Sequence, residues 1–233
     1  MVARFFLPLV FIFLTLLGAL TSAQFLMTGV VEEKENRISE LLLTSSSARE
    51  LMTGKVLGLG SLALTQLVYM VTLGLVLAAA TENLALLGDL RLGLLDLLVF
   101  GLFFLLNFFL ISGLMLIIGA AVAAEQESRQ IAGLVVLVTL IPLYAIIFQL
   151  ENLEGNPLLL FLSLFPLTAA PTVLMLSGFQ VMAAWQLPAS LAVLLLSTIV
   201  MLWAGARVFR RGILMYDQRL SLRQLRQIIQ GRA

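Results

Sequence analysis

The feature that most constrains this chain is a series of uninterrupted apolar runs, each long enough to cross a lipid bilayer. A transmembrane helix needs about 20 consecutive apolar residues, and such runs recur along all 233 residues. The composition agrees, because 61% of the residues are hydrophobic and 12% are charged, whereas a soluble domain is about half apolar and a quarter charged. We therefore predict an all-α integral membrane protein.

The apolar runs predict about five transmembrane helices in a single transmembrane domain that covers residues 1–209. The first run is too long for the h-region of a secretory signal peptide, which has about 7 to 15 residues. The third run is long enough to require tilt or an interfacial extension. The predicted spans are residues 5–27, 51–80, 92–124, 131–150 and 187–208.

The segment 158–179 is apolar enough to span the membrane, but it contains Pro166 and Pro171. A proline inside a helix removes a backbone hydrogen bond and kinks or breaks the helix. We therefore expect two short helices that enter the membrane and return to the same side, a geometry that is tolerated where protein buries the backbone. A sixth, kinked span is the alternative.

Two further segments combine charge with apolar residues at helical spacing. Residues 31–43 are predicted to form a short amphipathic helix at a membrane face. After it, Ser47 and Glu50 have the spacing of a capping box that opens the next helix. The tail, residues 210–233, carries six arginines among leucines and isoleucines, which predicts a basic amphipathic helix suited to an anionic cytoplasmic leaflet or a protein partner.

The distribution of Lys and Arg predicts the orientation, because these residues are enriched in cytoplasmic loops. If the links 32–50 and 125–130 and the tail are cytoplasmic, only Arg4 and Arg91 among the Lys and Arg residues lie outside. This arrangement requires the segment 158–179 to re-enter rather than cross. We expect a multi-pass protein of a bacterial or archaeal inner membrane, with membrane lipids around it, a cytoplasmic C-terminus and an external N-terminus.

The chain contains no histidine and no cysteine. These absences exclude imidazole-based triads, His-ligated zinc sites and thiolate metal sites, including the metal centre of an intramembrane protease. Gly54 and Lys55 also lack the remaining residues of a phosphate-binding GxxxxGK[ST] loop. We expect no catalytic residue, no metal, no cofactor bound by this chain and no nucleic-acid partner.

Charged residues are almost absent from the middle of the predicted spans. Because proton and ion relays use intramembrane charges, this scarcity favours a large amphipathic or lipid-like cargo. Asn107 and Gln66 are deep in spans, where we expect interhelical hydrogen bonds. Gly113 and Gly119 are expected to permit close helix packing. Packing is also the expected role of Gly54, Gly58 and Gly60, and a hinge at the cytoplasmic end of the second span is the alternative.

Several segments together resemble type 2 ABC exporter permeases of the sodium-efflux-permease-like branch. The resemblance is carried by residues 31–45, from Val31-Glu32-Glu33-Lys34 to Leu43-Thr44-Ser45, and by residues 50–58, Glu-Leu-Met-Thr-Gly-Lys-Val-Leu-Gly. It extends to residues 125–130 before a span and to residues 165–171 between the last two spans. It covers most of the chain from the first span onward.

The resemblance implies a permease with a coupling helix that docks on an ATP-binding subunit and with a re-entrant extracellular gate before the last span. Carried over, the gate residues are Pro166, Thr168 and Pro171. The docking residues are Glu32, Glu33, Glu35, Arg37, Ile38, Glu40 and Leu41. ATP and Mg would be bound by the partner subunit, and a second permease subunit would complete a homodimer or heterodimer.

We therefore interpret the chain as the membrane-spanning subunit of an ATP-driven exporter of an unidentified substrate, with no enzymatic activity of its own. Members of that branch usually begin with a further span and a large extracellular domain, neither of which is present here. The alternative is a non-transporting membrane scaffold or a truncated remnant of such a permease.

Overall fold

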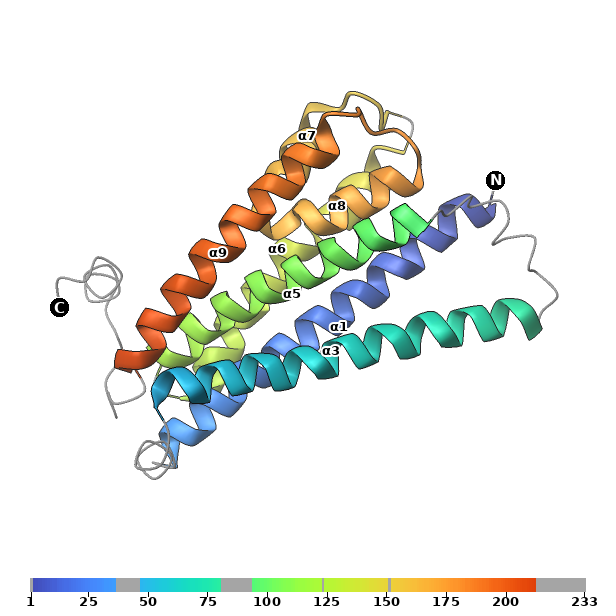
Figure 1. Cartoon of the computed structure of the whole chain (residues 1–233). Helices are drawn as coiled ribbons and strands as arrows, with labels where there is room; N and C mark the ends of the chain where they lie inside the picture. Colours follow the sequence, from blue (N-terminus) through green and yellow to red (C-terminus); the bar gives the residue numbers. More distant parts are fainter. Residues whose placement is uncertain (1, 37–46, 81–93, 123, 151, 213–233) are drawn as a thin grey trace. The chain divides into compact units, whose positions relative to one another are not determined.

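The computed structural model describes residues 2–36, 47–80, 94–122, 124–150 and 152–212. Every regular element in these residues is an α-helix, which confirms the predicted all-α class (Figure 1). The helices are α1 (Val2–Glu35), α3 (Ala48–Ala80), α5 (Leu94–Ala121), α6 (Glu125–Phe148), α7 (Pro157–Leu164), α8 (Pro166–Gly178) and α9 (Gln186–Gly212).

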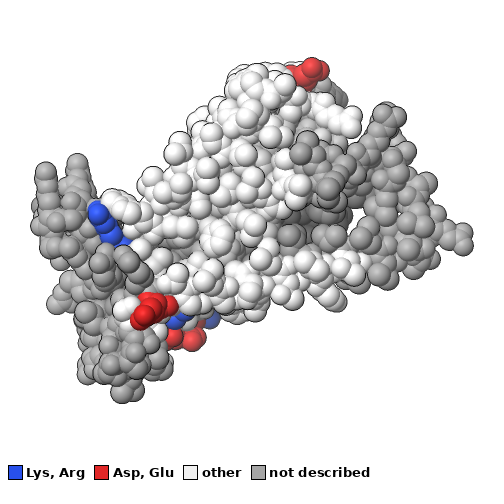
Figure 2. Space-filling view, viewed as in Figure 1, with Lys and Arg blue, Asp and Glu red and all other residues white. Residues whose placement is uncertain are grey.

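Three helices in the described part of the chain are long and apolar enough to cross a membrane. They are Leu98–Ala121 within α5, Glu125–Phe148 in α6 and Gln186–Phe209 within α9. The face drawn in Figure 2 is mostly uncharged, with its acidic and basic side chains confined to small areas. These features confirm a membrane fold, while the predicted number of about five spans stays a prediction.

Helix α1 differs from the prediction at its C-terminal end. It continues past residue 27 to Glu35, so Glu32 and Glu33 lie in its last turns instead of on a separate short helix beginning at residue 31. The physical reason is that no proline follows the apolar run, and Val30 and Val31 extend the buried face of α1. Charged residues alone do not end a helix.

Helix α6 begins at Glu125, within the segment that we predicted to be a hydrophilic link. Glu125 and Glu127 lie in its first turn, where the positive end of the helix dipole favours carboxylates. Arg129 forms an ion pair with Glu125 one turn later. The polar residues 125–130 are therefore the first turns of the helix, since they match the needs of a helix N-terminus.

The chain divides into two compact units. The first comprises Met1–Ala19, Ala63–Asn107 and Val138–Leu196, and the second comprises Leu20–Leu62, Phe108–Leu137 and Ser197–Ala233. Each of the five long helices contributes a segment to both units, whereas α7 and α8 belong to the first.

The second unit has a hydrophobic core to which four helices contribute. Leu26 and Val30 of α1, Val56 of α3, Leu116 of α5 and Phe209 of α9 are buried together. Helices in a membrane associate through van der Waals packing instead of removal of apolar surface from water, and this cluster packs the four segments against one another. Met52, Leu59 and Phe109 pack against it.

Glycines allow very close helix approach in this unit. A Cβ atom on Gly113 would lie 2.9 Å from the carbonyl carbon of Met201, and one on Gly205 would lie 3.0 Å from the carbonyl oxygen of Gly113. A Cβ on Gly119 would lie 3.1 Å from the carbonyl oxygen of Met27. The packing role predicted for Gly113 and Gly119 is therefore confirmed.

Gly54 and Gly58 of α3 differ from that expectation. A Cβ atom on either glycine would meet nothing within 4 Å, and both residues are exposed. They lie on a face of α3 that contacts no other described part of the chain at these positions. Packing inside the described chain therefore does not account for these two glycines, and the hinge stays a prediction. Gly60 does fit the packing role, because its Cβ would lie 3.1 Å from the Phe108 ring.

In the first unit, α7 and α8 are two short consecutive helices that pack against each other (Figure 1). The helical path breaks at Phe165, which has extended backbone angles, φ −80° and ψ 123°. The next residue is Pro166, the first residue of α8, and a proline pushes the residue before it away from helical angles. Pro171, by contrast, lies inside α8 without ending it.

The break at Pro166 agrees with the two short helices expected from the prolines. Their re-entry into a membrane stays a prediction, as does the alternative of a sixth span.

Candidate partner-docking site

Charged side chains gather in the second unit where α1 ends and where α3 and α6 begin. The last described turns of α1 present three different environments: Glu32 is exposed, Glu33 is half-buried and Lys34 is buried. We call this group, Glu32 to Glu35, the charged end of α1. Its members must therefore differ in role, although they are adjacent in the sequence.

Glu33 is engaged with α3. The Lys55 Nζ atom lies 2.5 Å from a carboxylate oxygen of Glu33 and also donates a hydrogen bond of 3.3 Å to the carbonyl oxygen of Gly29. The two side chains are only 19% and 24% exposed, so solvent screens the pair less than it would a fully exposed pair. This ion pair connects the charged end of α1 to the second turn of α3.

Lys34 is engaged with α5. Its Nζ atom donates hydrogen bonds of 3.2 Å and 3.0 Å to the carbonyl oxygens of Ala120 and Val122. Burial of the ammonium group lowers the pKa of Lys34 below its usual value, because a low-dielectric environment disfavours the charged form. The carbonyls at a helix C-terminus lack intrahelical partners, and Lys34 supplies a partner to two of them.

Helix α3 begins with the capping box that the sequence predicted. The backbone N–H and the hydroxyl of Ser47 each donate a 2.8 Å hydrogen bond to Glu50, and the Glu50 N–H donates a 3.3 Å bond back to the Ser47 hydroxyl. These hydrogen bonds hold the pKa of Glu50 below its usual value, since they stabilise the carboxylate. The cap fixes where α3 starts, and hence where Lys55 stands.

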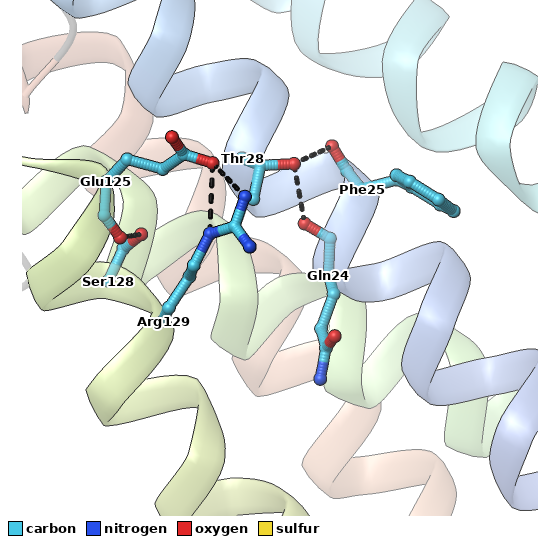
Figure 3. Close-up of polar contacts among 6 residues, drawn as sticks. All are labelled: Gln24, Phe25, Thr28, Glu125, Ser128 and Arg129. Carbon is cyan, nitrogen blue, oxygen red and sulfur yellow. Dashed lines mark hydrogen bonds and ion pairs between the residues drawn. The ribbon is translucent and has the colours of Figure 1, made fainter.

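The start of α6 adds a further pair of charges. Figure 3 shows the Arg129 guanidinium directed at the Glu125 carboxylate one turn earlier, with N···O distances of 2.5 Å and 3.0 Å. The Ser128 hydroxyl donates to the Glu125 carbonyl oxygen in the same turn. Glu32 of α1 also attracts Arg129 electrostatically. Exposed pairs of this kind contribute little to stability, so their effect is on the charge pattern of the surface.

The predicted docking residues divide into two groups. Glu32 and Glu33 are brought close to α6 and α3 respectively, and Glu35 is the last residue of α1. Arg37, Ile38, Glu40 and Leu41 lie outside the described residues. The docking role of all seven stays a prediction.

The predicted gate residues lie in the first unit. Thr168 is buried and donates a 2.7 Å hydrogen bond to the carbonyl oxygen of Leu162 across the break between α7 and α8. Thr172 donates a 2.6 Å bond to the Thr168 carbonyl oxygen. Pro166 starts α8, and Pro171 is buried within it. Thr168 therefore connects the two short helices, while the gate role stays a prediction.

Gln186 also holds this hairpin, a contact that the sequence did not predict. Its side-chain amide donates a 2.8 Å hydrogen bond to the hydroxyl of Ser163, and both residues are buried. Gln186 is the first residue of α9, so the bond connects α7 to the start of α9. Nothing in the local sequence distinguishes Gln186 from an ordinary polar residue at a helix start.

Lys34 was missed as a buried residue because it stands in the charged run Glu32 to Arg37. A periodic signal was nevertheless present. Met27, Val30 and Lys34 follow one another at spacings of three and four residues, which places them on one face of a helix, and all three are buried. Continuing that face through the charged run would have identified Lys34 as its last member.

Within the described residues, no group of three or more Asp or Glu side chains is arranged to hold a metal ion. The buried amide of Asn107 also differs from expectation, because neither its nitrogen nor its oxygen has a hydrogen-bond partner in the described part of the chain. The interhelical hydrogen bond predicted for it is therefore not found there.

Comparison with known proteins identifies the family. The family described as ABC-2 family transporter protein matches residues 1–207. The chain belongs to this ABC-2 transporter family. The expectation drawn from residues 31–45 and 50–58 is thereby confirmed at the level of the family, which is a family of membrane transport proteins.

Two relatives illustrate the family. The chain is 26% identical over 226 residues to the uncharacterized protein MJ1024 of Methanocaldococcus jannaschii, which covers 96% of this chain and 53% of the relative. It is 23% identical over 228 residues to the uncharacterized protein YhaP of Bacillus subtilis, covering 94% of this chain and 54% of the relative. The chain thus spans about half the length of these relatives. No solved structure matches it.

Proposed function

We propose that this chain is the membrane-spanning permease subunit of an ATP-driven ABC exporter. A separate ATP-binding chain binds ATP and Mg and hydrolyses the ATP. The observation that carries the proposal is the charged end of α1, attached to α3 by the Glu33–Lys55 pair, in a chain of the ABC-2 family. A segment attached in this way passes a displacement on to the helices behind it, because packed helices move as rigid elements.

Exposed Glu32 and the capped start of α3 flank residues 37–46, so a partner that engages this region meets a charged surface. We propose that the ATP-binding subunit docks through Glu32, Glu33, Glu35, Arg37, Ile38, Glu40 and Leu41 on the cytoplasmic side. The hairpin with Pro166, Thr168 and Pro171 serves as the extracellular gate. A second permease subunit, identical or related, completes the transporter.

The composition of the spans supports a proposal for the class of cargo. In the three helices apolar enough to cross a membrane, charged residues lie only near the ends, at Glu125, Glu127, Arg129 and Arg207. A dedicated ion or proton path uses charges near mid-depth. We therefore propose an amphipathic or lipid-like cargo, moved outward.

The test is affinity purification of the tagged chain from its native membrane in mild detergent, with identification of co-purifying proteins and assay of ATPase activity. We expect an ATP-binding subunit in the eluate. Reversal of charge in the variant Glu32→Lys/Arg37→Glu should abolish its capture. The matched control is Glu154→Lys, an exposed acid in the first unit, which should leave capture unchanged.

Retained capture in the double variant would contradict docking at this segment. Assembly with an ATP-binding subunit but without ATP turnover would instead favour the non-transporting scaffold. A folded chain that captures no ATP-binding subunit would favour the remnant.

A further inference from the structure

Lys34 is a buried cation in an unusual setting. The residue is only 3% exposed, and both hydrogen bonds of its ammonium group go to backbone carbonyls at the end of α5. Among the described residues, no carboxylate forms an ion pair with it, since the pairs found there are Lys55–Glu33 and Arg129–Glu125. Burial of an ammonium group without a counter-charge costs several kcal/mol.

An apolar side chain of similar volume would fill the same place without that cost. Replacement of buried ionic groups by apolar ones is often neutral or stabilising, so packing alone does not explain a lysine here. What the lysine adds is a directional connection. Its two donors attach α1 to the negative end of the α5 dipole, at Ala120 and Val122.

The connection continues beyond α5. Directly before Ala120, α5 approaches α1 again at Gly119 and Met27, and six residues further back its Gly113 meets Met201 and Gly205 of α9 backbone to backbone. Backbones that approach too closely to admit a Cβ atom are closely packed, and close-packed interiors transmit strain. A displacement delivered to the end of α5 therefore reaches α9.

We propose that Lys34 is a positioning residue that transmits displacement of the charged end of α1 to α5, and through the Gly113–Gly205 contact to α9. The inference rests on the proposed function, which supplies the source of the displacement. Under this inference α1 is connected to two helices. The Glu33–Lys55 pair transmits the displacement to α3, and Lys34 transmits it to α5.

The test uses the complex of the full chain with its ATP-binding subunit, reconstituted in lipid nanodiscs. The native sequence has no cysteine, so a nitroxide can be attached at one introduced cysteine, either Asn36→Cys just after α1 or Ala121→Cys at the end of α5. ATP with vanadate traps the partner in one state, and the change in each spectrum on trapping is measured.

We expect both labels to respond in the otherwise native chain. In Lys34→Met the label at residue 36 should keep its response, while the response at residue 121 should fall about fivefold or more, the size of a typical coupling between sites. In Lys34→Gln, which keeps an amide donor, the response at residue 121 should fall less. The matched control Lys55→Met removes the connection to α3 and should leave the response at residue 121 unchanged.

An unchanged response at residue 121 in Lys34→Met would overturn the inference, and so would an equal loss in Lys55→Met. If trapping moves neither label in the native chain, the proposed function fails. The connection from Lys34 to α5 is then tested separately, in the chain alone, by the distance distribution between nitroxides at residues 36 and 121. This distribution should broaden in Lys34→Met, and an unchanged distribution would refute the connection.

Discussion

At the scale of single residues, polar groups of the described helices divide into those that bond to another element or cap a helix and those that are buried without a partner there. Lys34 and Lys55 each join two helices, and the Ser47–Glu50 cap fixes the start of α3. Asn107 and Ser112 are buried with no hydrogen-bond partner in the described chain. The first group stabilises one arrangement of helices, whereas the second pays a desolvation penalty without return.

The capping box gives a prediction for Ser47→Ala. Loss of an N-cap hydroxyl costs about 1 kcal/mol, so the first turn of α3 should open more often. Hydrogen exchange of the Glu50 and Leu51 amides in detergent micelles should accelerate about fivefold. Thr72→Ala, which removes a hydroxyl bonded to the Val68 carbonyl within the same helix, is the control and should leave those amides unchanged.

The same cap should weaken in acid. The pKa of Glu50 is lowered in the folded chain from its usual 4.5, so its stabilisation is complete above pH 4.5 and is lost as the pH falls through the lower, folded value. Exchange of the Leu51 amide, corrected for its intrinsic pH dependence, should rise below that value. A cap that persists in Glu50→Gln at neutral pH would show that the carboxylate charge is not needed.

For Asn107 we predict that a substitution raises stability instead of lowering it. Its amide is fully buried, and an unsatisfied buried polar group costs about 1–3 kcal/mol. Asn107→Leu should therefore raise the midpoint of thermal unfolding, measured by circular dichroism in detergent. A lower midpoint would mean that the amide forms an interaction, for instance with a partner subunit, that the single chain lacks.

At the scale of elements, backbone contact between helices depends on glycine. Gly113→Ala should destabilise the chain by about 1–3 kcal/mol, the usual cost of overpacking, because its Cβ would lie 2.9 Å from a backbone carbon of α9. Thermal unfolding in detergent measures the loss. Gly133→Ala on α6, where a Cβ meets nothing within 4 Å, is the matched control and should stabilise through higher helix propensity.

Gly205→Ala tests whether the two glycines form one contact. Its Cβ would meet the carbonyl oxygen of Gly113, so the double variant should lose less stability than the sum of the two single variants, as neighbouring sites are not additive. Additive losses would show that each glycine matters for a separate reason.

The hairpin of α7 and α8 depends on a different contact. Gln186→Leu removes the donor to the Ser163 hydroxyl and should destabilise the chain by about 1 kcal/mol. Limited proteolysis should then cleave sooner between α8 and α9, at residues 179–185. Because Gln186→Leu and Asn107→Leu both replace an amide side chain by an apolar one, opposite shifts in thermal stability would separate a satisfied amide from an unsatisfied one.

At the scale of the whole molecule, the sequence predicted what depends on local pattern. Apolar length predicted the all-α membrane class, Pro166 predicted the break between α7 and α8, and the spacing of Ser47 and Glu50 predicted the cap. It did not predict the burial of Lys34 or the bond from Gln186 to Ser163, because both depend on groups 23 or more residues away in the chain.

The path of residues 158–179 decides the topology of the chain, and the absence of cysteine makes it directly measurable. Asn152 and Gln180 are exposed and lie on either side of the hairpin. If the hairpin re-enters, cysteines introduced at Asn152 and at Gln180 should both react with a membrane-impermeant maleimide added outside intact cells, whereas one at Asn36 should react only after lysis. Reaction of Asn152→Cys from outside and Gln180→Cys only after lysis would show a sixth span. Such a span would reverse the side of α9 and place the arginines of the tail outside, against the tendency of Lys and Arg to remain in the cytoplasm.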